Sequence, residues 1–219
     1  MARLDHLVVA ATSLATGAIW LEQRLGVPLQ PGGQHLAMGT HNRLLRLGDD
    51  CYLELIAVDP SLPAPARPRW FSLDAPDMQQ RLAAGPQLIH WVVATNNIET
   101  EAGLAGYAKD SIMTMSRGDY RWRITLPADG NLLDEGLRPS LIQWDVPMHP
   151  ARQLPDSGCR LMKLEALTAC AAGLKPALVE LGLHRAIDLQ PVPAGNAPEW
   201  LAYLETPAGL VEIGGQLTR

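Results

Sequence analysis

Two short stretches of the sequence almost repeat each other: residues 6–10 read His-Leu-Val-Val-Ala, and residues 90–94 read His-Trp-Val-Val-Ala. Each is a short apolar run that predicts a buried strand, with a histidine near its beginning. A polar side chain is unusual in such a strand, because its burial costs free energy unless it finds a partner. The recurrence indicates an internal repeat in which His6 and His90 occupy equivalent positions.

Working outward from these two strands, the sequence divides into three similar units. Unit one spans residues 1–60, unit two spans 87–147 and unit three spans 158–216, while a proline-rich connector and a helix fill 61–86. In each unit the pattern predicts a strand, a helix and then three strands. In unit one, for example, Ser13 is positioned to cap a helix that ends near Gly26. Such triplication predicts units that complete one another's cores.

The composition narrows the class of protein. The chain has 219 residues, of which 47% are hydrophobic, and its formal net charge is −5. These values fit a globular protein, and the lack of a basic stripe argues against nucleic-acid binding. Cys51, Cys159 and Cys170 form no C-x-x-C pair, which suits a reducing cytoplasm. We therefore expect a cytoplasmic protein with no membrane span, whose partner is a small molecule.

The polar positions of the first strand have counterparts in the last strand of each unit. Glu54 lies in the last strand of unit one, and the matching position of unit two is Gln143. In unit three the first-strand position holds Leu164 and the last-strand position holds Glu212. These two residues are separated by the same number of residues as His6 and Glu54.

With these positions the chain resembles the glyoxalase-like branch of the vicinal oxygen chelate superfamily, which includes glyoxalase I and bleomycin-resistance proteins. The resemblance is carried by three stretches: Asp5-His-Leu-Val-Val-Ala10, Pro31-Gly-Gly-Gln-His35 leading to Gly39-Thr-His-Asn42, and Tyr52-Leu-Glu-Leu-Ile56. It implies an α+β fold of repeated βαβββ units, whose mixed, curled sheets form a cleft.

The resemblance also implies a divalent metal, Zn, Ni, Fe, Co or Mn, bound in that cleft. Transferred position by position, its ligands are His6 and Glu54 from unit one with His90 and Gln143 from unit two. Glu212 is the alternative fourth ligand, because units two and three, or one and three, could form the cleft instead. We prefer units one and two because that pair uses both histidines. The competing interpretation is that each histidine is a core residue bonded to a backbone carbonyl.

Further site residues are expected around this metal. Glu54 or His41 would move a proton, Asn42 and Arg117 would contact the substrate, and Trp91 and Trp144 would wall an apolar pocket. Each has a structural alternative: a solvated turn for His41, a hairpin surface for Arg117 and core packing for the tryptophans. His35 and His149 are expected in a loop and a turn.

Two functions remain open. The first is a metal-dependent lyase, isomerase or hydrolase that chelates a small oxygenated metabolite and stabilises an enolate or alkoxide. The second is a metal-free protein that sequesters an apolar ligand. The third unit either packs on the back of the other two or pairs with its copy in a homodimer, and we favour the homodimer.

Overall fold

Three consecutive stretches of the chain have the same order of elements. The computed structural model describes residues 2–193, 196 and 198–216. Unit one contains β1 (Arg3–Ala10), α1 (Leu14–Leu25), β2 (Gln30–His35), β3 (Thr40–Gly48) and β4 (Cys51–Val58). After α2 (Pro76–Ala84), unit two contains β5 (Gln87–Ala94), α3 (Ile98–Leu104), β6 (Ile112–Arg117), β7 (Tyr120–Thr125) and β8 (Ser140–Trp144). Unit three contains β9 (Arg160–Leu167), α4 (Ala171–Glu180), β10 (Asp188–Gln190), β11 (Glu199–Thr206) and β12 (Gly209–Gln216).

Short elements and caps follow the local sequence. The 3-10 helices are η1 (Lys109–Ser111), η2 (Asp134–Gly136) and η3 (Pro150–Gln153). Helix α1 begins after Ser13, whose hydroxyl accepts a hydrogen bond from the Thr16 backbone N–H, and it ends at Gly26 in the left-handed conformation. None of the helices in the described residues has the length and hydrophobicity that crossing a bilayer requires.

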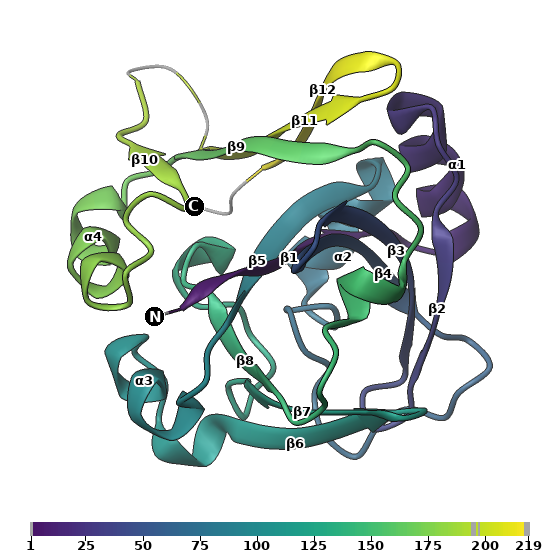
Figure 1. The fold of residues 1–219 in the computed structure, drawn as a ribbon. Helices are drawn as coiled ribbons and strands as arrows, with labels where there is room; N and C mark the ends of the chain where they lie inside the picture. Colours follow the sequence, from purple (N-terminus) through teal and green to yellow (C-terminus); the bar gives the residue numbers. More distant parts are fainter. Residues whose placement is uncertain (1, 194–195, 197, 217–219) are drawn as a thin grey trace.

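Units one and two share one eight-stranded sheet, in the order β2-β3-β4-β1-β5-β8-β7-β6. Antiparallel pairing of β1 with β5 joins the two units at its centre, and parallel pairs β1–β4 and β5–β8 flank that pair. The sheet is mixed and curls, so its inner face is enclosed (Figure 1). The predicted α+β fold with mixed, curled sheets is therefore confirmed.

The inner and outer faces of this sheet bury separate cores. Val8 of β1 and Val92 of β5 belong to the inner core, which the connector and α2 cover with Phe71 and Met78. The neighbours Val9 and Trp91 face outward instead. Because both faces are covered, β1, β4 and β5 are buried along nearly their whole length.

Unit three covers the outer face rather than extending the large sheet. Its strands form a separate four-stranded sheet in the order β10-β9-β11-β12, which lies across the back of β1 and β5 (Figure 1). Leu164, Trp200 and Ile213 pack in the same core as Val9 and Trp91. Unit three thus packs on the back of the other two, the arrangement that was the less favoured of the two expected from the sequence.

A buried histidine ties β5 to the segment before β8. His90 is fully buried, its Nδ1 lies 2.8 Å from the carbonyl oxygen of Gly136, and its Nε2 accepts a hydrogen bond from the backbone N–H of Ser140 at 3.2 Å. Nε2 also lies 3.0 Å from the Ser140 hydroxyl. The ring therefore donates from Nδ1, and burial lowers its pKa to about 3. His90 matches the core interpretation of the sequence, with both ring nitrogens engaged by the chain itself.

The contact between the two sheets provides a first test of the fold. A Cβ atom on Gly215 of β12 would collide with the carbonyl oxygen of Leu88 in β5. We expect Gly215→Ala to lower the free energy of unfolding by about 1–3 kcal/mol, as overpacking does, in urea titrations. The control is Gly103→Ala in α3, where nothing lies within 4 Å of the new Cβ. Equal stability of both variants would contradict the close approach of the sheets.

The burial of neutral His90 predicts how stability depends on pH. The unfolded chain takes up a proton on this ring as the pH falls through 6.5, whereas the folded chain does so only near pH 3. The free energy of unfolding therefore falls with decreasing pH in this window, by up to about 1.4 kcal/mol per pH unit for this group. We expect His90→Gln to be less stable at about pH 7 but to show a shallower slope between about pH 6.5 and 5. The control is His184→Gln at an exposed position, which should leave the dependence of stability on pH unaltered. If the free energy of unfolding fell equally steeply with pH in wild type and His90→Gln, His90 would not be the neutral buried group described here.

Candidate functional site

An inner chamber lies between the two halves of the curled sheet. Its volume is about 20 Å³, enough for one water-sized group. The apolar walls come from the connector, β7 and β8, and they consist of Trp70, Phe71, Trp122, Ile124, Ile142 and Trp144. The polar side chains come from β1, β2, β4 and β6, and they are His6, His35, Tyr52, Glu54 and Arg117. The polar groups thus face an aromatic wall across a small space.

A β-bulge in β1 places Asp5 beside His6. The pairing with β5 shifts register between Leu4 and His6, so Asp5 is the extra residue of the bulge. Its Oδ1 lies 2.6 Å from His6 Nδ1, and its Oδ2 accepts hydrogen bonds from Trp144 Nε1 at 2.7 Å and His149 Nε2 at 2.9 Å. Burial would raise the pKa of Asp5, but the hydrogen bonds to His149 and His6 hold it well below its usual range. Asp5 is therefore a buried carboxylate with three donors.

These contacts fix the tautomers of two histidines. The backbone N–H of Ala151 donates to His149 Nδ1, so the proton of neutral His149 is on Nε2 and points at Asp5. The Nδ1–H of His6 likewise donates to Asp5, so Nε2 is the ring nitrogen that faces the chamber. Tyr52 stacks on the His6 ring with 4.5 Å between the ring centroids. His6 is thus held in one orientation, with its basic nitrogen turned away from Asp5.

Glu54 lies opposite that basic nitrogen. His6 Nε2 and Glu54 Oε2 are 3.7 Å apart, which is too long for a direct hydrogen bond and leaves room for a substrate atom or a water beside both. The other carboxylate oxygen, Oε1, accepts a hydrogen bond from Asn42 Nδ2 at 2.5 Å. His6 and Glu54 are both nearly inaccessible to solvent.

Asn42 also connects Glu54 to Arg117. Its Oδ1 accepts from Arg117 Nη1 at 3.0 Å and from the Gly33 backbone N–H at 2.9 Å. A Cβ at position 33 would lie 2.8 Å from Arg117 Cδ, so a larger residue than Gly33 would displace the Arg117 side chain. Arg117 Nη1 also lies 3.3 Å from His35 Nε2, and burial together with this cation holds the pKa of His35 well below its usual range. His35 is therefore neutral and accepts from Arg117.

Part of the Arg117 guanidinium is available to bind a ligand. Its hydrogen bonds within the described part of the chain come from Nη1, and no carboxylate there forms an ion pair with it. Nη2 and Nε are thus oriented by the rest of the side chain but remain open to an anion. Since a guanidinium binds carboxylate or phosphate oxygens in pairs, Arg117 suits an anionic ligand.

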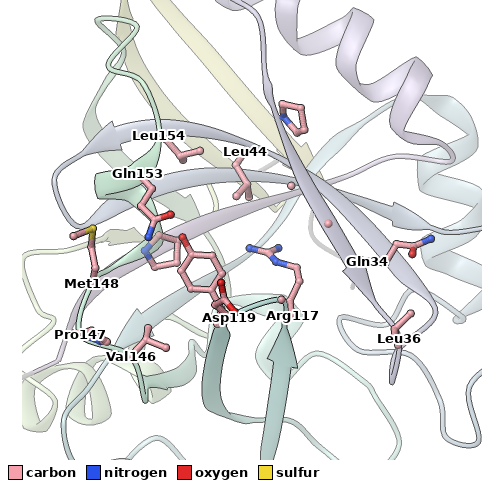
Figure 2. Close-up of a pocket in the computed structure, with 16 residues that line it drawn as sticks. Gln34, Leu36, Leu44, Arg117, Asp119, Val146, Pro147, Met148, Gln153 and Leu154 are labelled. Atoms are coloured by element: carbon pink, nitrogen blue, oxygen red, sulfur yellow. The ribbon is translucent and has the colours of Figure 1, made fainter.

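A wider groove of about 820 Å³ lies outside the chamber and shares Arg117 with it. Figure 2 shows Arg117 in the middle of this groove, with Gln34 and Leu36 on one side and Val146, Pro147 and Met148 on the other. The β6–β7 turn forms one wall, and the segment around η3 forms another. Arg117 therefore stands where the groove meets the chamber.

The four metal ligands implied by the resemblance do not come together. The register of β1 and β5 places His6 opposite Val92, whereas His90 lies opposite Val8 and is engaged in the core. Gln143 faces away from the chamber and accepts a hydrogen bond from the Ile98 backbone N–H at 3.0 Å. Its neighbours Ile142 and Trp144 take the inner positions, and Glu212 is exposed on β12.

The donors that are present do not fit the expected metal. His6 and Glu54 supply one nitrogen and one carboxylate, and within the described ranges no cluster of three or more His, Cys, Asp or Glu side chains is suitable for a metal ion. The guanidinium of Arg117 lines the same chamber, where a divalent cation would be repelled. The residues therefore do not reproduce the four-ligand site.

The other predicted residues divide into two groups. Arg117, Trp144 and Glu54 line the chamber, and Asn42 bonds to two of them. Trp91 is in the outer core, where its Nε1–H donates to the Leu137 carbonyl. His41 pairs with Asp59 at 3.3 Å and does not line the chamber.

Several residues of the site escaped the sequence analysis. His35, expected to pack in a loop, is buried at the end of β2, and His149, expected in a turn, is buried before η3 and bonds to Asp5. Asp5, Tyr52, Trp70 and Phe71 were not singled out. The pair Asp5-His6, two adjacent polar residues in an apolar strand, was the available signal for a bulge.

Comparison with known proteins agrees with this architecture. The sequence matches the family described as Glyoxalase-like domain over residues 4–182. No curated protein gives a significant match.

Solved structures give matches at low identity. A hypothetical protein from Staphylococcus aureus has a TM-score of 0.54 at 14% identity, covering 99% of this chain and 86% of that one. Methylmalonyl-CoA epimerases from Streptomyces coelicolor (TM-score 0.42, 17% identity, 68% of this chain and 98% of that one) and Mycobacterium tuberculosis (0.40, 16%, 64% and 85%) also match. At these identities the likeness concerns the fold alone. The family match over most of the chain confirms the predicted resemblance, and the chain belongs to the glyoxalase-like domain family.

Proposed function

We propose that the protein is an enzyme that moves a proton on a small, anionic, oxygenated metabolite without a metal. Membership of the glyoxalase-like domain family supports an enzyme of small metabolites. The observation that carries the proposal is the Asp5–His6 hydrogen bond of 2.6 Å, which engages His6 Nδ1 and directs Nε2 toward Glu54 in a chamber with aromatic walls. A base oriented by a carboxylate is the usual arrangement for proton transfer by histidine.

His6 is the base in this proposal. The C–H bond next to a carbonyl breaks, its proton passes to His6 Nε2, and the electron pair moves onto the carbonyl oxygen to give an enolate. Asp5 and Glu54 lie on either side of the imidazolium that forms, so the new positive charge is stabilised in a buried setting. Return of a proton to the opposite face of the same carbon completes an epimerisation. Where that carbon carries a hydroxyl group, the hydroxyl proton moves to the enolate oxygen and the carbon-bound proton returns to the former carbonyl carbon, which completes an isomerisation.

Arg117 binds the anionic end of the substrate. The side chain lines the chamber and the groove, and its free donors match two oxygens of a carboxylate. Asn42 holds both Arg117 and Glu54 and so sets the separation between the anion site and the reacting carbon. No step passes through a metal, because His90 and Gln143 do not join His6 and Glu54.

The test measures deuterium exchange at carbon by NMR in D2O, with pyruvate, 2-oxobutanoate and uncharged glyceraldehyde as probes. We expect wild type to accelerate exchange, and His6→Gln, which removes the base, to lower the rate about 10²–10⁴-fold. Glu54→Gln, which removes a charge that stabilises the imidazolium, should lower the rate as well. Arg117→Met should raise the KM for the two anions more than for glyceraldehyde, since it removes only the charge that holds the carboxylate.

Two controls accompany this experiment. Dialysis against EDTA should leave the exchange rate unchanged, and His184→Gln, at an exposed position in unit three, should behave as wild type. Loss of exchange with EDTA and its recovery with Zn²⁺ or Ni²⁺ would replace this mechanism with metal-dependent chemistry.

A second candidate function is sequestration of an aromatic or apolar ligand. It is favoured by the aromatic wall, in which the centroids of Trp122 and Trp144 are 5.4 Å apart and Trp70 stacks on Phe71. Binding of the probes with no exchange in any of them would favour this function over catalysis.

A further inference from the structure

The chamber and the groove differ greatly in size and in chemistry. The chamber, of about 20 Å³, accommodates a single small group, whereas the groove of about 820 Å³ is within the usual range for a whole ligand. Because Arg117 lines both, a ligand that reaches the His6–Glu54 pair with its reacting end must leave the rest of its body in the groove. The geometry therefore separates a head from a tail.

We infer that the substrate is a compound with a single anionic head and an extended, uncharged, apolar tail that lies in the groove. The inference rests on the proposed function for the position of the head at Arg117. It goes beyond that function in assigning the groove to the tail and in excluding a second charge there.

The apolar surface of the groove supports this assignment. Leu36 and Met148, on opposite sides of Arg117, are 70% and 49% exposed, so two large apolar side chains face solvent at the rim (Figure 2). Leu44 and Leu154 line the groove between them. An apolar tail would remove this surface from water, which is favourable in proportion to the area covered.

The charge of the groove decides against a polyanionic tail. Among the residues that line it, the charged ones are Arg117 and Asp119. Arg117 serves the head, and Asp119 is exposed on the β6–β7 turn, where it would repel a second negative group. A tail with phosphates or a second carboxylate would therefore lose its hydration without gaining a cation.

The experiment measures dissociation constants by calorimetry for acetate, butanoate, hexanoate and octanoate, and for hexanedioate. We expect the affinity to rise from butanoate onward by about two- to fourfold per methylene, the gain that burial of a methylene gives. Hexanedioate, with the same number of carbons as hexanoate and a second charge, should bind at least about tenfold more weakly.

Matched variants locate the effect. Leu36→Gln and Met148→Gln should reduce the gain in affinity with chain length while leaving the affinity for acetate unchanged. Both side chains are exposed, so we expect the variants to fold as wild type does. The controls are Leu210→Gln and Met162→Gln, equally exposed apolar residues on β12 and β9 in unit three. Arg117→Met should weaken every carboxylate of the series.

The outcomes separate this inference from the proposed function. A flat series, or equal affinity for hexanoate and hexanedioate, overturns the apolar tail even if pyruvate exchange still depends on His6. A rising series that is sensitive to Leu36 and Met148 supports it even if no probe exchanges, in which case the catalytic role fails alone. No measurable binding of any carboxylate overturns both.

Discussion

The antiparallel pairing of β1 with β5 is the constraint on which the rest of the molecule depends. It joins units one and two into one sheet, and its register decides which side chains face the chamber. The bulge at Asp5 adds one residue to β1, so that Asp5 and His6 can bond to each other instead of pointing to opposite faces. Without that extra residue, strand alternation would separate the carboxylate from the imidazole.

The sequence allowed the fold class and the His6–Glu54 pair to be predicted. The near-repeat of residues 6–10 and 90–94 revealed the internal repetition, and polar residues in apolar strands pointed to His6 and Glu54. The same argument placed His90 and Gln143 with them, where the structure has Val92 and Trp144. Gln143 is one residue from Trp144 and so points to the other face, whereas His90 lies two residues from Val92, beside Phe71, where Gly136 and Ser140 engage its ring. The sequence does not record the bulges that set this register.

The central strands are buried on both faces, and this is why the residues that face the chamber could not be recognised from the sequence. Strands β1, β4 and β5 are covered inside by the connector and α2 and outside by α1 and unit three, so their apolar residues do not alternate with polar ones. An alternating strand shows its inner face in the sequence, whereas a strand buried on both sides does not. Asp5 and His149 were missed for a related reason, since their contact joins residues far apart in the chain and no local pattern indicates it.

The balance of charge in the site follows from which groups are kept neutral. His35 and His90 are neutral because burial lowers their pKa values, and His35 also faces the Arg117 cation. Asp5 keeps its charge because three donors replace the water it has lost. Arg117 is then left as the cation at the entrance, held by the neutral acceptors Asn42 and His35 rather than by a carboxylate. A cation held in place by neutral groups retains its charge for a ligand, and this makes the entrance to the chamber selective for an anion.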